Sequence, residues 1–99
     1  MSKLTVAIPN YNGGDNQRRS IESCLAIQMP ENDYEILIVD NKSTDNSIKI
    51  ANEMKIKFTN IRIVQNEKNL GRIQNWNAVI EKTQSKYLIF LFSNDLINE

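Results

Sequence analysis

The fold of this 99-residue chain is decided by the stretch Tyr34-Glu35-Ile36-Leu37-Ile38-Val39-Asp40. Its apolar run is nearly continuous and ends at a carboxylate, which is typical of a parallel β-strand covered on both faces. Three further short apolar runs have the same character, and they are Leu4–Ile8, Ile61–Val64 and Tyr87–Phe92. The sequence therefore predicts four buried parallel strands.

Helical patterns fill the three intervals between these runs. We expect helices over Asp15–Gln28, Asp45–Lys57 and Gly71–Gln84, the second of them after the N-cap cluster Ser43-Thr44-Asp45. Their predicted core-facing residues are Ile21, Cys24, Leu25 and Gln28 in the first helix, Ile48, Ala51 and Met54 in the second, and Ile73, Trp76, Asn77 and Ile80 in the third. Strand and helix thus alternate as βαβαβαβ, which predicts an α/β fold with a doubly wound parallel sheet in one domain over residues 1–99.

The composition excludes several kinds of chemistry. The chain has no histidine, so it encodes no Ser-His-Asp triad and no histidine-ligated zinc site. Its one cysteine, Cys24, forms neither a disulfide framework nor a Cys-x-x-Cys motif, and its place on an apolar helix face indicates packing. Any chemistry must use carboxylates, amides, hydroxyls, backbone donors or a bound metal.

Charge and hydropathy indicate where the protein works. Twelve basic and twelve acidic residues give a net charge of zero. The chain also has no block of basic residues of the kind that binds nucleic acid, so we expect no nucleic-acid partner. The apolar runs are far shorter than the ~20 residues that cross a bilayer, so we predict no transmembrane segment. The N-terminus runs directly into a strand pattern without a secretory signal, and we expect a cytoplasmic protein.

Polar residues follow the predicted strands at their carboxyl ends. In open α/β sheets, ligands bind at this edge, close to the point where the strand order reverses. The segments that follow the four strands are Pro9 to Gly14, Asp40-Asn41, Asn66 to Gly71, and Ser93 to Asp95. Each carries amides, carboxylates or a polar aromatic group, and their convergence predicts a binding site.

The common nucleotide-loop motifs do not occur here. No Gly-x-Gly-x-x-Gly follows the first strand, which argues against a dinucleotide-binding dehydrogenase, and no P-loop motif is present. A receiver-type signalling domain needs an acidic cluster after its first strand, where this chain has Pro9-Asn10.

Five ordered motifs resemble the family 2 glycosyltransferases, and together they span the whole chain. The segment Val6 to Asn12 is similar to the family's opening strand and Pro-Thr-Tyr-Asn loop, and Ser20 to Leu25 resembles its first helix. Glu35 to Asp45 follows Glu-Ile-Ile-Val-Val-Asp-Asp-Gly-Ser-Thr-Asp, with Asn41 and Lys42 in place of Asp-Gly. Asn66 to Gly71, followed by Asn77, resembles Asn-x-x-Asn-x-Gly with its helix asparagine, and Lys86 to Asp95 resembles the family's Asp-x-Asp strand.

This resemblance implies a Rossmann-like half-domain that binds a nucleoside-diphosphate sugar. Pro9, Asn10, Tyr11 and Asn12 would surround the base and ribose, with the Tyr11 ring as a flat apolar face. Asp40 would accept a hydrogen bond from the base. Gly71 and Arg72, at a helix N-terminus, would lie near the anionic groups, and Asn77 would complete the nucleotide-binding set.

The resemblance also implies a divalent metal, Mn²⁺ or Mg²⁺, on the diphosphate. Asn94 and Asp95 are its predicted ligands, because Phe92 and Asn94 replace the two acids of Asp-x-Asp and only the following Asp95 is retained. The family's catalytic base comes from the half of the domain beyond residue 99, so none is assigned. We interpret the chain as the N-terminal, donor-binding part of a longer catalytic domain.

Three hypotheses remain open. The leading one is the donor-binding half of an inverting glycosyltransferase that transfers a sugar to the hydroxyl of an acceptor glycan or lipid-linked sugar in polysaccharide assembly. The second is a non-catalytic nucleotide or nucleotide-sugar binding module, and the third is a receiver-like interaction domain. The last strand ends on uncovered apolar residues, which also predicts a homo-oligomer or another covering partner.

Overall fold

The computed structural model describes residues 3–25, 33–69, 71–83, 85 and 87–91. The elements in chain order are β1 (Leu4–Asn10), α1 (Gly14–Leu25), β2 (Tyr34–Asp40), α2 (Ser47–Lys57), β3 (Ile61–Gln65), α3 (Arg72–Lys82) and β4 (Tyr87–Phe90). The predicted alternation of four strands and three helices is confirmed.

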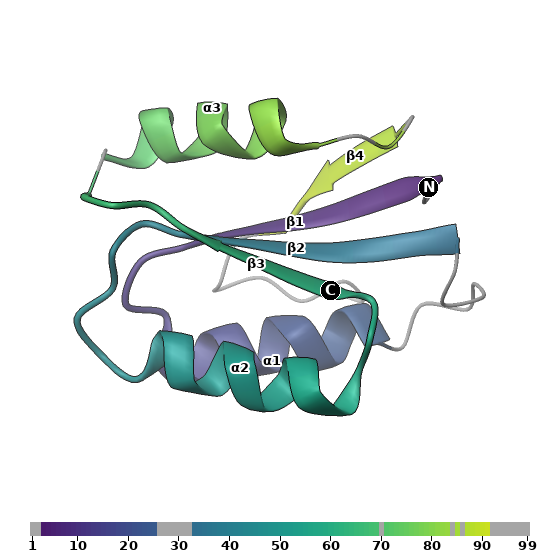
Figure 1. Cartoon of the computed structure of the whole chain (residues 1–99), viewed down its shortest axis with the longest axis horizontal. Helices are drawn as coiled ribbons and strands as arrows, with labels where there is room; N and C mark the ends of the chain where they lie inside the picture. The colour runs from purple at the N-terminus through teal and green to yellow at the C-terminus, as the bar shows by residue number, and fades with distance from the viewer. Residues whose placement is uncertain (1–2, 26–32, 70, 84, 86, 92–99) are drawn as a thin grey trace.

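The four strands form one parallel sheet in the order β3-β2-β1-β4. The chain first moves outward from β1 to β3 and then returns to add β4 on the other side of β1. Helices α1 and α2 cover one face of the sheet and α3 covers the other (Figure 1). This is the predicted doubly wound sheet, and its strand order reverses between β1 and β4.

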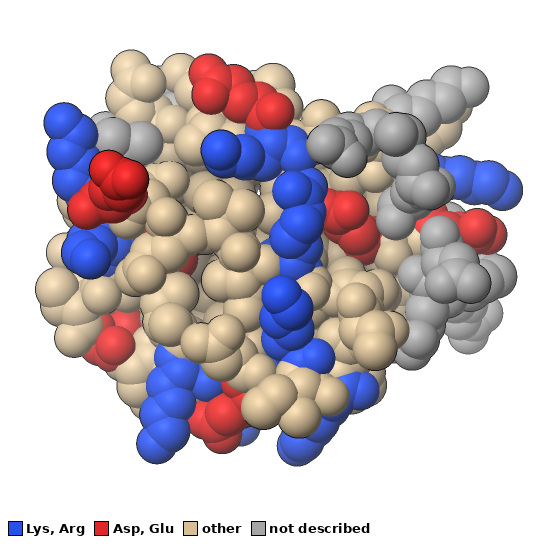
Figure 2. Space-filling model, in the orientation of Figure 1, with Lys and Arg blue, Asp and Glu red and all other residues tan. Residues whose placement is uncertain are grey.

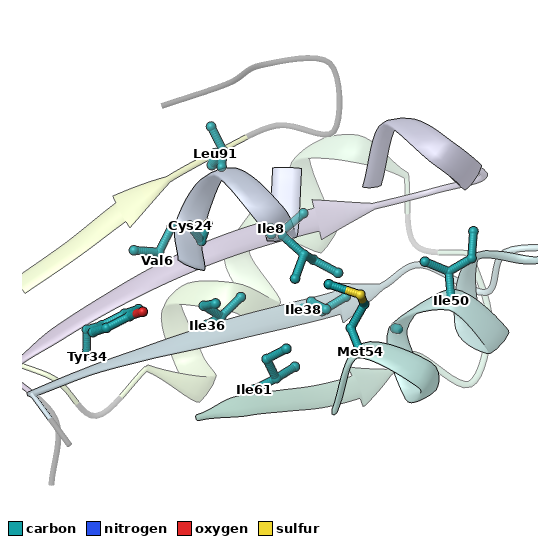
Figure 3. Packing of buried hydrophobic residues seen from close by; sticks show 12 residues of the cluster. Val6, Ile8, Cys24, Tyr34, Ile36, Ile38, Ile50, Met54, Ile61 and Leu91 are labelled. Atoms are coloured by element: carbon teal, nitrogen blue, oxygen red, sulfur yellow. The ribbon is translucent and has the colours of Figure 1, made fainter. Parts of the chain in front are cut away.

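Two apolar clusters fill the spaces between the sheet and its helices. The larger lies under α1 and α2, and Figure 3 shows Ile8 and Ile38 of the central strands pointing toward Met54 of α2. The smaller lies under α3 and contains Ala7, Leu37, Val39 and Val79. Because successive strand residues point to opposite faces, the continuous apolar runs supply both clusters.

Strand β1 is longer than the sequence predicts and includes Pro9. Pro9 has no N–H to give to a neighbouring strand, and such a residue is tolerated only where no partner is needed. The pairing of β1 with β4 stops at Ala7, whereas the pairing with β2 continues to Asn10 and Asp40. Hydrogen bonds alternate in direction along β1, so the Pro9 nitrogen faces the side on which β4 has already ended.

Helix α2 begins at Ser47, two residues later than predicted. The carboxamide oxygen of Asn12 accepts hydrogen bonds from the Thr44 and Asp45 backbone nitrogens, at 2.8 and 3.2 Å, and this holds both residues in the loop. Asp45 then accepts a 2.9 Å bond from the Ser47 nitrogen, so it stabilises the first turn from outside the helix. Ile50 occupies a core position with Ala51 and Met54, while the predicted core residue Ile48 is half-buried.

The predicted buried face of α3 is wrong at Asn77 and Ile80. Among the α3 residues whose side chains the structure describes, Val79 and Asn75 are buried, whereas Ile80 is 56% exposed and Asn77 is also exposed. The side chain of Ile73, another predicted core residue, lies outside the described residues. Trp76 is half-buried. Apolar periodicity misassigned the face because a hydrogen-bonded amide, Asn75, occupies a position that a pattern of apolar residues alone does not reveal.

Strand β4 leaves apolar side chains uncovered, as expected. Tyr87 and Ile89 are 60% and 52% exposed, and they pair with Leu4 and Val6 on the sheet face that α1 and α2 cover elsewhere.

On the surface seen in Figure 2, basic side chains form a row down the middle of the view, with acidic side chains above the row and to its right. Among the described residues, no helix is long and apolar enough to cross a membrane.

Candidate functional site

The carboxyl ends of β1, β2 and β3 bring the predicted polar segments to one edge of the sheet. Asn10 and Asp40 end paired strands side by side, and Gln65 ends the next strand in register with Asp40. Backbone hydrogen bonds continue past the strands, from the Asn41 nitrogen to the Asn10 carbonyl and from the Asn66 nitrogen to the Asp40 carbonyl, both at 2.8 Å. The loops after these strands therefore start from fixed positions.

The Asp40 carboxylate lies beneath this edge and is fully buried. Its Oδ1 accepts from Asn10 Nδ2 at 2.9 Å and from the Ser43 hydroxyl at 2.6 Å. Its Oδ2 accepts from the Ser43 backbone nitrogen at 2.8 Å and, more weakly, from Gln65 Nε2 at 3.5 Å. A carboxylate has about four acceptor positions, so these four donors fill it.

Asn12 ties the loop after β1 to the loop after β2. Its backbone nitrogen donates to Ser43 Oγ at 2.9 Å, while its side-chain oxygen holds the Thr44 and Asp45 backbone nitrogens. Asn12 adopts φ 52°, a left-handed conformation that asparagine tolerates better than most residues. The two loops consequently form one hydrogen-bonded unit.

Tyr11 is 50% exposed and lies between the two anchored residues Asn10 and Asn12. Its backbone is held on both sides while half of its side-chain surface remains open to solvent. An exposed aromatic ring on a fixed loop at the carboxyl edge of a parallel sheet offers a flat surface to a planar ligand.

A second network, made of amide side chains, joins β2 to the start of α3. Asn41 Nδ2 donates to Asn69 Oδ1 at 2.9 Å, and Asn41 Oδ1 accepts from Asn66 Nδ2 at 3.1 Å. Asn66 Nδ2 also donates to Asn75 Oδ1 at 2.7 Å, and Asn75 Nδ2 reaches the Val39 carbonyl at 3.3 Å. This network fixes the loop after β3 against the end of β2.

The Gly71 loop is positioned by the same network. The Gly71 nitrogen donates to Asn69 Oδ1 at 2.7 Å, and its carbonyl accepts from the Asn75 nitrogen at 3.0 Å in the first turn of α3. The backbone of Gly71 has φ 82° and ψ 162°, a region essentially restricted to glycine. The Arg72 side chain and the predicted metal ligands Asn94 and Asp95 lie outside the described parts of the structure.

The structure thus brings Pro9, Asn10, Tyr11, Asn12, Asp40 and Gly71 together at this edge, and it places the Asn77 side chain on the exposed surface of α3. Sequence reasoning placed Asn41 and Asn66 in the polar segments at this edge without giving them a role, and it missed Ser43 and Asn75 as residues that hold the site in shape. Asn41 and Asn66 directly follow the ends of two strands, and this position in the sequence indicates that they lie at the site. Asn75 lies inside a helix, where nothing in the sequence distinguishes it from a surface residue.

The Cys24 thiol lies away from this edge. Cys24 is fully buried in the larger apolar cluster, and desolvation by burial raises the pKa of its thiol to about 12. It is therefore packing, as expected, and not a nucleophile. Within the described ranges, no group of three or more Asp, Glu or Cys side chains is arranged to hold a metal ion.

Comparison with known proteins defines the family. The glycosyl transferase family 2 model matches residues 5–97, and the chain belongs to this family. The resemblance inferred from the five motifs is confirmed.

Individual relatives agree with this assignment. The poly(ribitol-phosphate) beta-glucosyltransferase of Bacillus spizizenii is 35% identical over 96 residues, which are 96% of this chain and 15% of that protein. The crystal structure of Staphylococcus aureus TarS 1-349 in complex with UDP-GlcNAc is 27% identical with a TM-score of 0.88, over 97% of this chain and 28% of that one. The chain therefore spans less than a third of either relative.

A more distant structure shares the fold. The mannosyltransferase PcManGT of Pyrobaculum calidifontis, solved with GDP-Man and Mn²⁺, has a TM-score of 0.90 at 16% identity, over 98% of this chain and 29% of that one. The Rossmann-like fold of nucleotide-sugar transferases predicted from the sequence is confirmed.

Proposed function

We propose that the carboxyl edge of β1, β2 and β3 binds a nucleoside-diphosphate sugar. The observation that carries this proposal is the half-exposed Tyr11 ring on a loop whose flanking residues, Asn10 and Asn12, are anchored to the neighbouring loop. Such a ring can stack on a nucleobase without first being ordered. The UDP-GlcNAc complex of TarS supports the same ligand class, with uridine as the first base to test.

The other predicted residues have roles that follow from their place at this edge. Pro9, Asn10 and Asn12 form the turn around base and ribose, and Asp40 lies beneath it. Gly71 precedes α3 and Arg72 begins it, and the positive end of the helix dipole at this point favours the anionic diphosphate. Asn77 belongs to the predicted nucleotide-binding set through its motif, and its side chain is exposed on α3.

A divalent metal is the proposed cofactor on the diphosphate. Asn94 and Asp95 remain its predicted ligands, and an amide next to a single carboxylate suits a hard cation that is also held by phosphate oxygens. When bound, the metal would neutralise charge on the departing nucleoside diphosphate.

The activity that we propose is sugar transfer with inversion. An acceptor hydroxyl attacks the anomeric carbon from the side opposite the nucleotide, the bond to the diphosphate breaks, and a general base, for which no residue is assigned, takes the hydroxyl proton. The Bacillus relative's name specifies poly(ribitol-phosphate) as its acceptor, which supports a cell-surface polymer or lipid-linked glycan as the acceptor class here. Nucleotide sugars are made in the cytoplasm, and we place the reaction there.

A non-catalytic nucleotide-sugar binding module is the second candidate. The observation that favours it is the replacement of both acids of the Asp-x-Asp motif by Phe92 and Asn94. Loss of two charges weakens a metal site, and an enzyme that relies on metal to stabilise its leaving group would lose activity.

Calorimetric titration with UDP, GDP and dTDP, each with and without Mn²⁺, tests the proposal. Binding of one diphosphate that tightens with Mn²⁺ supports the enzyme, and binding that is unchanged by metal supports the module. If none of the three nucleotides binds, both proposals fail. Transfer itself is measured as nucleotide release from the donor in the full-length protein with and without acceptor.

A further inference from the structure

Three polar residues form a row across the ends of β1, β2 and β3 (Figure 1). Asn10 pairs with Asp40, and Asp40 pairs with Gln65, so the three occupy matching positions in the parallel sheet. Side chains at every second strand position share a face, and the row therefore continues the face to which Ile38 contributes in the larger apolar cluster. An amide, a carboxylate and a second amide thus lie side by side at the edge of the sheet.

The four donors to the Asp40 carboxylate are not equivalent. Its Oδ1 accepts from Asn10 Nδ2 at 2.9 Å and from the Ser43 hydroxyl at 2.6 Å, and its Oδ2 accepts from the Ser43 backbone nitrogen at 2.8 Å. The contact from Gln65 Nε2 to Oδ2 is 3.5 Å long, beyond the roughly 2.7–3.2 Å of an ordinary N–H···O bond, and the Gln65 side chain is exposed. Gln65 is therefore the donor of these four that can leave Asp40 without displacing a loop, and its departure frees one acceptor position on Oδ2.

Asp40 Oδ2 and Gln65 Nε2 then form an acceptor next to a donor. Uracil, thymine and guanine carry a ring N–H next to a ring carbonyl, which is the complementary pattern. Cytosine and adenine carry an unprotonated ring nitrogen next to an amino group. This second pattern would place a lone pair against the carboxylate and an amino group against the amide donor, so neither hydrogen bond could form.

The half-exposed Tyr11 ring lies one residue beyond Asn10, beside the row. The hydrogen-bonding groups of a base lie at its edge, so they remain open when the flat face of the base stacks on an aromatic ring. Tyr11 can therefore hold the face of a base while Asp40 and Gln65 meet its edge.

We propose that Gln65 is a specificity-determining residue, whose side-chain amide leaves Asp40 and donates to the base carbonyl beside the N–H that Asp40 accepts. This inference rests on the nucleotide-binding function proposed above and deepens it. The donor class is then a nucleoside diphosphate of uracil, thymine or guanine, and cytosine and adenine are rejected.

Thio-substituted nucleotides test the contact atom by atom. Calorimetry on the 99-residue chain measures the Kd of UDP, 2-thio-UDP and 4-thio-UDP for the wild type and for Gln65→Met, which keeps the length of the side chain and removes the donor. Gln65→Met is expected to weaken UDP by about 3- to 10-fold, as the loss of one hydrogen bond does. It is expected to change the Kd of one of the two thio analogues by less than about 2-fold, because sulfur is a weak acceptor. If the variant changes all three Kd values by the same factor, Gln65 only covers Asp40 and the proposal is overturned.

A second variant reverses the hydrogen-bonding pattern at the same position. Gln65→Glu replaces the amide donor by a carboxylate acceptor of nearly the same shape, which opposes a base carbonyl and accepts from the amino group of cytosine. The preference for UDP over CDP, measured as the ratio of their Kd values, is expected to fall by about 10-fold. A ratio that stays at its wild-type value would contradict the donor role of Gln65.

Gln74 provides the matched control, since it is an exposed glutamine on α3. Gln74→Met is expected to leave the ratios between UDP, its thio analogues and CDP unchanged, and the same ratio changes in both methionine variants would reject a local effect of Gln65. Binding of UDP to the wild type decides between the two levels of the account. If UDP binds and every ratio survives in the Gln65 variants, this inference alone fails, whereas a wild type that binds none of UDP, GDP and dTDP rejects the proposed function as well.

Discussion

Asn66 Nδ2 lies 2.7 Å from Asn75 Oδ1 and connects the loop after β3 to the first turn of α3. Asn75 also donates to the Val39 carbonyl near the end of β2, so a single buried amide connects β2, β3 and α3. The start of α3, where we propose that the diphosphate binds, is thus held by side-chain amides as well as by apolar packing.

Replacement of Asn75 should destabilise the protein. Asn75→Ala removes the buried hydrogen bonds that Asn75 makes with Asn66 Nδ2 and with the Val39 carbonyl, and we expect a loss of about 1–3 kcal/mol in the free energy of unfolding. Asn77→Ala, two residues along the same helix and exposed, should change it by less than about 0.5 kcal/mol. Urea denaturation measures both, and equal losses would contradict the buried role of Asn75.

Backbone conformation predicts opposite effects at two loop positions. Gly71→Ala should cost about 1–3 kcal/mol, because φ 82° with ψ 162° is strained for alanine even though no atom lies within 4 Å of the added Cβ. Lys42 has φ 63°, and Lys42→Gly should leave stability unchanged or raise it by up to about 1 kcal/mol, because glycine relieves the strain of a left-handed residue. Urea denaturation gives both signs, and a neutral Gly71→Ala would refute the assigned strain.

The larger apolar cluster should dominate stability. Ile36 is fully buried in it, so Ile36→Ala should cost about 2–5 kcal/mol. Ile56, which is 85% exposed on α2, provides the same substitution at the surface, and Ile56→Ala should cost less than about 0.5 kcal/mol. Thermal denaturation that failed to separate the two variants would contradict the observed packing.

Cys24 predicts a dependence of stability on alkaline pH. Burial raises the pKa of the folded thiol to about 12, above its ordinary value of 9.0, so the unfolded chain loses this proton first. Its contribution to stability is complete below pH 9 and declines as the pH rises from 9 toward 12. The difference in unfolding free energy between the wild type and Cys24→Ala should follow this decline, and iodoacetamide should label Cys24 at pH 8 only after unfolding. Rapid labelling of the folded chain would contradict its burial.

The sheet was predictable from the sequence because four continuous apolar runs can be satisfied only by strands covered on both faces. The carboxyl edge followed from topology, which places the segments after parallel strands together. Comparison with the family motif also indicates local backbone conformation, as Lys42 shows. Lys42 occupies the position at which the family motif has glycine, and it adopts the left-handed conformation that glycine favours.

The internal bonding of the site could not be predicted from the sequence. Nothing in the order of residues shows that the Asp40 carboxylate accepts hydrogen bonds from Asn10 and Ser43, since these partners come from the end of β1 and from the loop after β2. The buried face of α3 was misassigned for a related reason. A buried amide resembles a surface residue in any hydropathy pattern until its hydrogen-bond partners are known.

Backbone amide chemical shifts during titration with UDP test the central claim most directly. The account predicts shifts confined to the carboxyl edge of the sheet, which the structure builds from residues 10–14, 40–45, 65–69 and 71. Lys3, Asp33 and Asn60, at the opposite edge, should not change. Shifts centred on that opposite edge, or no shifts at saturating UDP, GDP and dTDP, would contradict the assignment of a nucleotide site.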